Sequence, residues 1–169
     1  MRTVRVALII ALTCLLAFVL VGCGEKVGTA PDGNEHEIEK AAKQAAVDFF
    51  QNRYSIVDAQ EVKDWVDLGE IMTVIDIRPE SDYLKGHLPG AVNAEIDRDE
   101  ESTTEQIEAF LALLPQNPES IVVVYDDYTA LAGSHRAAIY AADAGYTRVC
   151  RFLGGAIAWE DAGNSLTKK

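Results

Sequence analysis

Cysteine is scarce in this 169-residue chain, and its three cysteines do not form a pattern that binds zinc or makes a redox pair. Cys14, Cys23 and Cys150 are too far apart for the CxxC spacing that such sites use. Positive charge is also scarce. The chain has 15 lysines and arginines but 27 aspartates and glutamates, which gives a formal net charge of -12. We therefore expect no binding of nucleic acid or of an anionic lipid surface by general electrostatic attraction.

Long hydrophobic runs are absent except at the N-terminus, where an almost unbroken apolar stretch covers residues 6–21. Arg2 and Arg5 precede it, and this order of charge and apolar run is typical of a signal peptide. The run is shorter than the roughly 20 residues that an untilted spanning helix needs, which favours cleavage. An uncleaved N-terminal anchor helix is the alternative, and both interpretations place the rest of the chain outside the cytoplasm.

Residues 20–23, with the sequence LVGC, resemble the lipobox of bacterial lipoprotein signal peptides. This resemblance implies that residues 1–22 are removed and that Cys23 becomes the first mature residue, carrying fatty acyl groups such as palmitate. Loss of two arginines and no acid changes the formal net charge from -12 to about -14. We expect an exported protein that is lipid-anchored to the cell membrane or the outer membrane.

The same assignment restricts the chemistry of sulfur in the mature chain. Cys14 leaves with the signal peptide and Cys23 is occupied by lipid, so Cys150 is the one free thiol. We therefore expect no intrachain disulfide, and the stability of the mature chain must come from its hydrophobic core.

Two segments lie between the lipid site and the main domain. Residues 23–34 are rich in glycine and polar side chains and include Pro31, which predicts a flexible spacer. Apolar residues recur at three- and four-residue intervals over residues 35–53, so an amphipathic helix is expected within 35–54. This helix either docks on the domain or binds a partner. The remaining residues, 55–165, are long enough for one domain.

Helical and extended patterns alternate through this domain. Mostly apolar strand-like runs cover residues 71–77 and 121–125, and a third strand is predicted over 148–153. Helices are predicted between them, including residues 103–114 and 134–144. This alternation predicts an α/β fold with a parallel sheet between helices. Since ligands of such sheets bind at the carboxyl ends of strands, we expect a site in the loops after residues 77 and 125.

Residues 74–93, VIDIRPESDYLKGHLPGAVN, resemble the rhodanese (thiosulfate sulfurtransferase-like) family. Asp76 and Arg78 match its Asp-x-Arg after the first central strand, and residues 86–93 match its GHIPGAxN signature. VVVYDD at 122–127 and GYTRVCRFLGGAIAW at 145–159 match its active-site strand and its closing strand, glycine pair and helix. The resemblance implies a three-layer sandwich, with a central parallel sheet covered by helices on both faces.

The resemblance also implies a cysteine directly after the strand that ends at Tyr125, because in this family that thiolate carries a persulfide. Here the position holds Asp126, which cannot carry persulfide sulfur. Cys150 falls inside a predicted strand, where a buried thiol has little thiolate character. We therefore expect no catalytic residue, with Asp126 at the nucleophile position.

Five residues are candidates for lining the former active-site pocket. In this set Arg136 is aligned with the arginine that closes the family's loop, and Asp76 with Arg78 forms a pair that locks loops by charge-assisted hydrogen bonds. A structural role is also expected for His87. The candidates are Asp76, Arg78, Asp126, Asp127 and Arg136.

A cation site at Asp126, Asp127 and His135 is an alternative interpretation, since carboxylates at a strand end can hold a hard metal. Adjacent residues of an extended chain point in different directions, and a following helix N-terminus repels cations. Loop capping and solvated charge are the favoured explanation for these residues, so we expect neither a metal nor a cofactor.

Three functions are consistent with the sequence. The favoured one is a non-catalytic, membrane-anchored rhodanese-like module that binds a protein or a small anion through the pocket. An active sulfurtransferase acting on thiosulfate or persulfide sulfur is the alternative. A third interpretation is a structural lipoprotein whose working surface is the helix predicted within 35–54.

Overall fold

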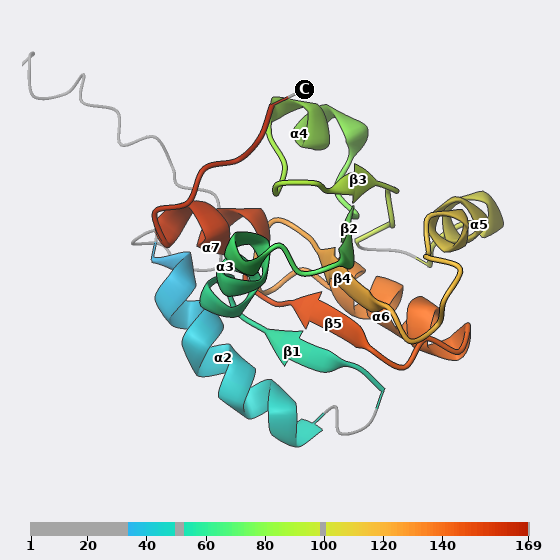
Figure 1. The fold of residues 1–169 in the computed structure, drawn as a ribbon, viewed down its shortest axis with the longest axis horizontal. Coiled ribbons are helices and arrows are strands. Elements are labelled where there is room, and N and C mark those ends of the chain that lie inside the picture. Colours follow the sequence, from blue (N-terminus) through green and yellow to red (C-terminus); the bar gives the residue numbers. More distant parts are fainter. Residues whose placement is uncertain (1–33, 50–52, 99–100, 169) are drawn as a thin grey trace, which may run out of the picture.

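The computed structural model describes residues 34–49, 53–98 and 101–168 of the chain (Figure 1). The predicted signal peptide, Cys23 and most of the spacer therefore lie outside the described residues. In the part that is described, none of the helices combines the length and the apolar character that a membrane crossing requires.

A single sheet of five strands forms the centre of the described domain, and every pair of neighbouring strands runs parallel. Its spatial order is β1-β5-β4-β2-β3. This arrangement confirms the predicted α/β class with a parallel sheet. The strands are β1 (Ser55–Val57), β2 (Met72–Asp76), β3 (Val92–Asn93), β4 (Ile121–Tyr125) and β5 (Val149–Phe152).

Helices cover both faces of this sheet (Figure 1). The side chains of α3 (Ala59–Leu68), α4 (Glu80–Lys85) and α7 (Gly155–Asp161) pack into one hydrophobic cluster. Those of α5 (Thr104–Ala112) and α6 (Gly133–Asp143) pack into the cluster on the opposite face. The resulting three layers match the architecture expected from the family resemblance.

β4 explains why the central strands are apolar along their whole length. All five of its residues are buried, and they alternate between the two clusters. Val123 and Tyr125 face the α3–α7 side, whereas Val122 and Val124 face the α5–α6 side. A strand covered on both faces needs apolar residues at consecutive positions. β4 is thus a fixed support for the residues that follow it.

Local signals in the sequence set the ends of the helix after β1. The backbone N–H of Glu61 donates to Asp58 Oδ1 at 3.0 Å, and the N–H of Asp58 donates to Glu61 Oε2 at 2.9 Å. This reciprocal pair is a capping box. Gly69 ends the helix in the left-handed conformation that is typical of a glycine cap.

The N-terminal helix α2 (Glu35–Phe49) lies beside α7 and β1 (Figure 1). The sequence pattern predicts that this helix docks through an apolar stripe. Among its described side chains, however, the carboxylates of Glu35 and Glu39 are fully buried. The sequence predicts this helix within residues 35–54; residues 50–52 lie outside the described part of the chain, and Arg53 lies in a turn. Polar contacts therefore dock the first turns of this helix.

Candidate functional site

The site lies where β2 and β4 end side by side. Asp76 and Tyr125 are opposite each other in the parallel register, so the segments that follow them emerge at the same edge of the sheet. This is the edge at which ligands of parallel sheets bind. The two loops predicted from sequence to form a site are thus adjacent in the structure.

Asp76 and Arg78 form a buried ion pair at this edge. Arg78 Nε donates to both carboxylate oxygens of Asp76, at 3.0 and 3.1 Å, and Nη2 donates to Oδ2 at 2.7 Å. Nη2 also donates to the carbonyl of Gly86 at 2.6 Å. The guanidinium therefore ties the end of β2 to the turn after α4, which is the structural role expected for this pair.

Tyr125 completes this buried cluster from β4. Its hydroxyl donates to Asp76 Oδ2 and accepts the backbone N–H of Leu88 at 3.0 Å. The guanidinium carbon of Arg78 lies 5.6 Å from the centre of the Tyr125 ring, within the range of a cation–π contact. Burial, followed by the negative charge of Asp76, raises the pKa of Tyr125, so this hydroxyl stays protonated.

Asp126 occupies the first position after β4, and only 1% of its surface is exposed. Its Oδ1 accepts the backbone N–H of Asp127 at 2.8 Å and lies 2.8 Å from Arg98 Nη2. Its Oδ2 has no hydrogen-bond partner and lies against Gly133, the first residue of α6. A Cβ atom at position 133 would come within 2.7 Å of this oxygen. The carboxylate therefore fills the space at the N-terminal end of α6.

The environment of Asp126 has opposing effects on its ionisation. Burial raises its pKa to about 6, although the positive charge of Arg98 acts in the opposite direction. The N-terminal end of a helix such as α6 also stabilises a negative charge. Asp126 thus places a carboxyl group, largely ionised at pH 7, in a position that is closed to solvent.

Arg98 is a site residue that the sequence analysis missed. Its Nη2 lies 2.8 Å from Asp126 Oδ1 and 2.9 Å from Asp127 Oδ2, so one guanidinium holds both carboxylates. Asp127 also binds Arg78 Nη1 at 3.2 Å. Arg98 lies in an irregular segment between β3 and α5, where no motif marks it.

The loop of residues 126–133 is held from three directions. From α7, the backbone N–H groups of Ala156 and Ile157 donate to the carbonyls of Asp126 and Asp127, both at 3.0 Å. From β5, the buried Arg151 donates to the carbonyl of Leu131 at 3.0 Å. From α2, Glu35 Oε1 accepts the backbone N–H of Thr129 at 2.9 Å. These contacts fix the loop to three separate elements of the fold.

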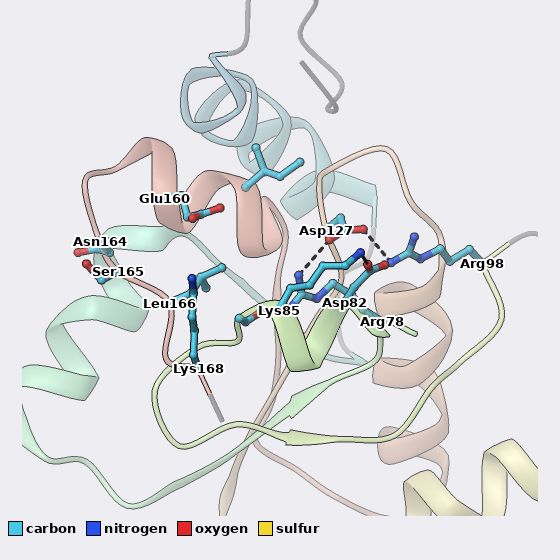
Figure 2. A pocket seen from close by; sticks show the side chains of 12 residues that line it. Arg78, Asp82, Lys85, Arg98, Asp127, Glu160, Asn164, Ser165, Leu166 and Lys168 are labelled. Atoms are coloured by element: carbon cyan, nitrogen blue, oxygen red, sulfur yellow. Dashed lines mark hydrogen bonds and ion pairs between the residues drawn. The ribbon is translucent and has the colours of Figure 1, made fainter. Parts of the chain in front are cut away.

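An open pocket of about 800 Å³ lies above this cluster (Figure 2). Arg78 and Asp127 form part of its floor, while α4, α7 and the C-terminal segment supply the walls. Its charged lining is mixed, with four basic and three acidic side chains: Arg78, Lys85, Arg98, Lys168, Asp82, Asp127 and Glu160.

The structure separates the five pocket candidates into three groups. Arg78 and Asp127 line the pocket, whereas Asp76 and Asp126 are buried and do not contribute to its lining. Arg136 does not line the pocket, and its Nη1 donates to the carbonyl of Asp97 at 2.8 Å. Arg151 binds the backbone of the loop instead, and the sequence analysis did not identify it because it lies within a strand.

His87 and His135 contact residues that do not belong to the cluster around Asp76 and Asp126. His87 stacks on Tyr83 with ring centres 4.0 Å apart, and its backbone pairs with Thr167 in an antiparallel bridge. His135 Nδ1 lies 2.6 Å from the hydroxyl of Tyr54. Among the residues described, no group of three or more histidine, cysteine, aspartate or glutamate side chains is arranged to hold a metal ion.

Cys150 lies in β5 and is buried, as expected from the sequence. Burial raises the pKa of its thiol to about 11, so the thiolate fraction at neutral pH is very small. Cys150 is among the residues that line a second pocket of about 460 Å³, formed partly by β1 and by Trp65 of α3. Cys150 is not among the residues that line the pocket above Asp127.

Comparison with known proteins places this architecture in a family. The model of the rhodanese-like domain family matches residues 58–162, which is more than half of the chain. The SseB protein of Mycobacterium tuberculosis, provisionally named a thiosulfate sulfurtransferase, is 29% identical over an alignment covering 66% of this chain. The chain spans about half the length of that relative, since the alignment covers 45% of it.

Solved structures share the fold. The rhodanese-like domain of the Alr3790 protein from Anabaena is 23% identical, with a TM-score of 0.54, over 67% of this chain and 78% of that one. SseA from Escherichia coli, described as a 3-mercaptopyruvate sulfotransferase, is 21% identical, with a TM-score of 0.51, over 70% of this chain and 51% of that one. Since the family model also covers β2, β4 and both site loops, this chain belongs to the rhodanese-like domain family.

Proposed function

We propose that this protein is a non-catalytic, membrane-anchored rhodanese-like module that binds a partner through the pocket above Arg78 and Asp127. The observation that carries this proposal is the placement of Asp126. Its buried carboxylate fills the position that the family resemblance assigns to the sulfur-carrying cysteine. A carboxylate cannot form a persulfide, and its negative charge opposes the approach of thiosulfate.

The charge of the pocket supports a protein partner more than a small anion. Arg78 and Arg98, the cations at its floor, are already paired with Asp76, Asp126 and Asp127. A small anion would have to compete with these carboxylates for both guanidinium groups. A protein surface that carries charges of both signs complements the mixed lining of the pocket.

A sulfur-transfer assay tests the absence of catalysis. Purified protein is incubated with thiosulfate and cyanide, and thiocyanate is measured with an active member of the family as positive control. We expect no thiocyanate above the protein-free reaction, because Cys150 is buried, with a raised pKa.

A Cys150→Ser variant is assayed in parallel. Turnover that disappears in this variant would identify Cys150 as a nucleophile and would refute the non-catalytic assignment. Turnover that persists in the variant would also refute it, since it would require a sulfur carrier other than the one thiol of the predicted mature chain.

The proposed anchor is supported by the LVGC sequence at residues 20–23, which lie outside the described structure. Cells that express the full chain are labelled with a fatty acid, and the labelled protein is isolated from the membrane fraction. We expect label on the wild-type protein and none on a Cys23→Ala variant. Label on that variant equal to the wild type would show that Cys23 is not the lipidation site.

A further inference from the structure

The helix α2 contacts the loop that carries Asp126, although the match to the family model begins only at residue 58, after this helix. Glu35, the first residue of α2, is fully buried, and its Oε1 accepts the backbone N–H of Thr129 at 2.9 Å. Thr129 lies in the middle of the loop of residues 126–133. A carboxylate from outside the matched domain therefore holds this loop by a charge-assisted hydrogen bond.

Glu39, one turn further along α2, keeps the helix in place. Its Oε1 accepts the N–H of Gly154 at 2.8 Å, directly before α7, and its Oε2 accepts the N–H of Ala59 at 3.2 Å. The backbone N–H of Glu35 itself donates to Asp161 Oδ2 at 2.8 Å. The first two turns of α2 are thus bonded to α7, to the start of α3 and to the site loop.

We propose that Glu35 is a positioning residue for the loop of residues 126–133, and that α2 is therefore part of the site. Both backbone polar groups of Thr129 have a partner. Its N–H donates to Glu35, and its carbonyl accepts a hydrogen bond from Arg151 Nη2 at 3.5 Å. This assignment holds whether or not the site is catalytic. It also connects the loop with the chain segment that follows the proposed lipid anchor.

Amide hydrogen exchange tests this role directly. In a Glu35→Ala variant we expect exchange at the Thr129 amide to be faster by about tenfold or more, because a charged acceptor of this buried bond is lost. Glu39 remains in place in this variant, so exchange across α2 and α3 is expected to change much less. Exchange at Thr129 that equals the wild type would overturn the assignment.

Two matched variants separate positioning from general stability. Glu35→Gln retains a side-chain oxygen that can accept the Thr129 N–H, so it is expected to recover most of the protection. Glu37→Ala changes an exposed glutamate of the same helix, paired with Lys40, and is expected to leave Thr129 unchanged. An equal increase in all three variants would show that the loop responds to the stability of the helix and not to Glu35.

Discussion

Replacement of Arg78 by methionine is expected to lower the free energy of unfolding by about 3–5 kcal/mol. The carboxylate of Asp76 is fully buried and would lose all three hydrogen bonds that it accepts from the guanidinium. The carbonyl of Gly86 would lose its donor as well. Urea denaturation followed by circular dichroism measures the change.

The matched control is Arg53→Met, which removes an arginine from an exposed pair with Asp143. Because solvent screens that pair, its loss is expected to cost less than about 1 kcal/mol. An Arg78→Lys variant keeps the charge but lacks the planar fork, so an intermediate loss is expected. Equal stability of Arg78→Met and Arg53→Met would show that burial does not govern the strength of the Asp76 pair.

Replacement of Gly155 by alanine is expected to have the second large effect, because it acts on the backbone of the site. Gly155 has a φ of +63°, and a Cβ atom there would lie 2.0 Å from the carbonyl oxygen of Asp126. No rotamer change relieves a clash with backbone, so α7 or the site loop must shift. We expect a loss of about 3 kcal/mol or more in the free energy of unfolding.

Gly69→Ala controls for the strain of the left-handed conformation alone. Gly69 has a nearly equal φ of +67°, but no atom lies within 4 Å of the Cβ that alanine would add. Its replacement is expected to cost about 1–2 kcal/mol. The difference between the two variants in urea denaturation therefore measures the close approach of α7 to Asp126. A difference near zero would contradict the role of Gly155 in that contact.

The order of the elements could be predicted because local patterns determine it. The apolar run of β4 has the predicted bounds, and the capping box that begins α3 joins Asp58 and Glu61, which are only three positions apart. The pairing of β2 with β4 follows from the rules for parallel sheets, and it explains why the loops after Ile77 and Tyr125 meet. Asp76 ends β2, and Arg78 and Asp127 lie two positions after β2 and β4, so all three could be assigned to this edge.

Other contacts of the site could not be predicted because they join residues far apart in the chain. Arg98 lies in an irregular segment and reaches Asp126 and Asp127 across 28 and 29 positions. Arg151 lies within a strand, where an alternating pattern gives no sign that its side chain binds a loop. Arg136 aligns with the arginine that closes the family's loop, but its side chain donates to the carbonyl of Asp97.

The sequence by itself determined the helices and strands, the α/β class and the absence of a cysteine after β4, because each depends on short-range patterns or on a single residue. The tertiary structure alone decided which groups neutralise Asp126 and which elements hold its loop. Glu35 shows the reason, since it binds Thr129 across 94 positions. A buried carboxylate on a helix predicted to dock by its apolar face acquires its role only when folding brings the loop to it.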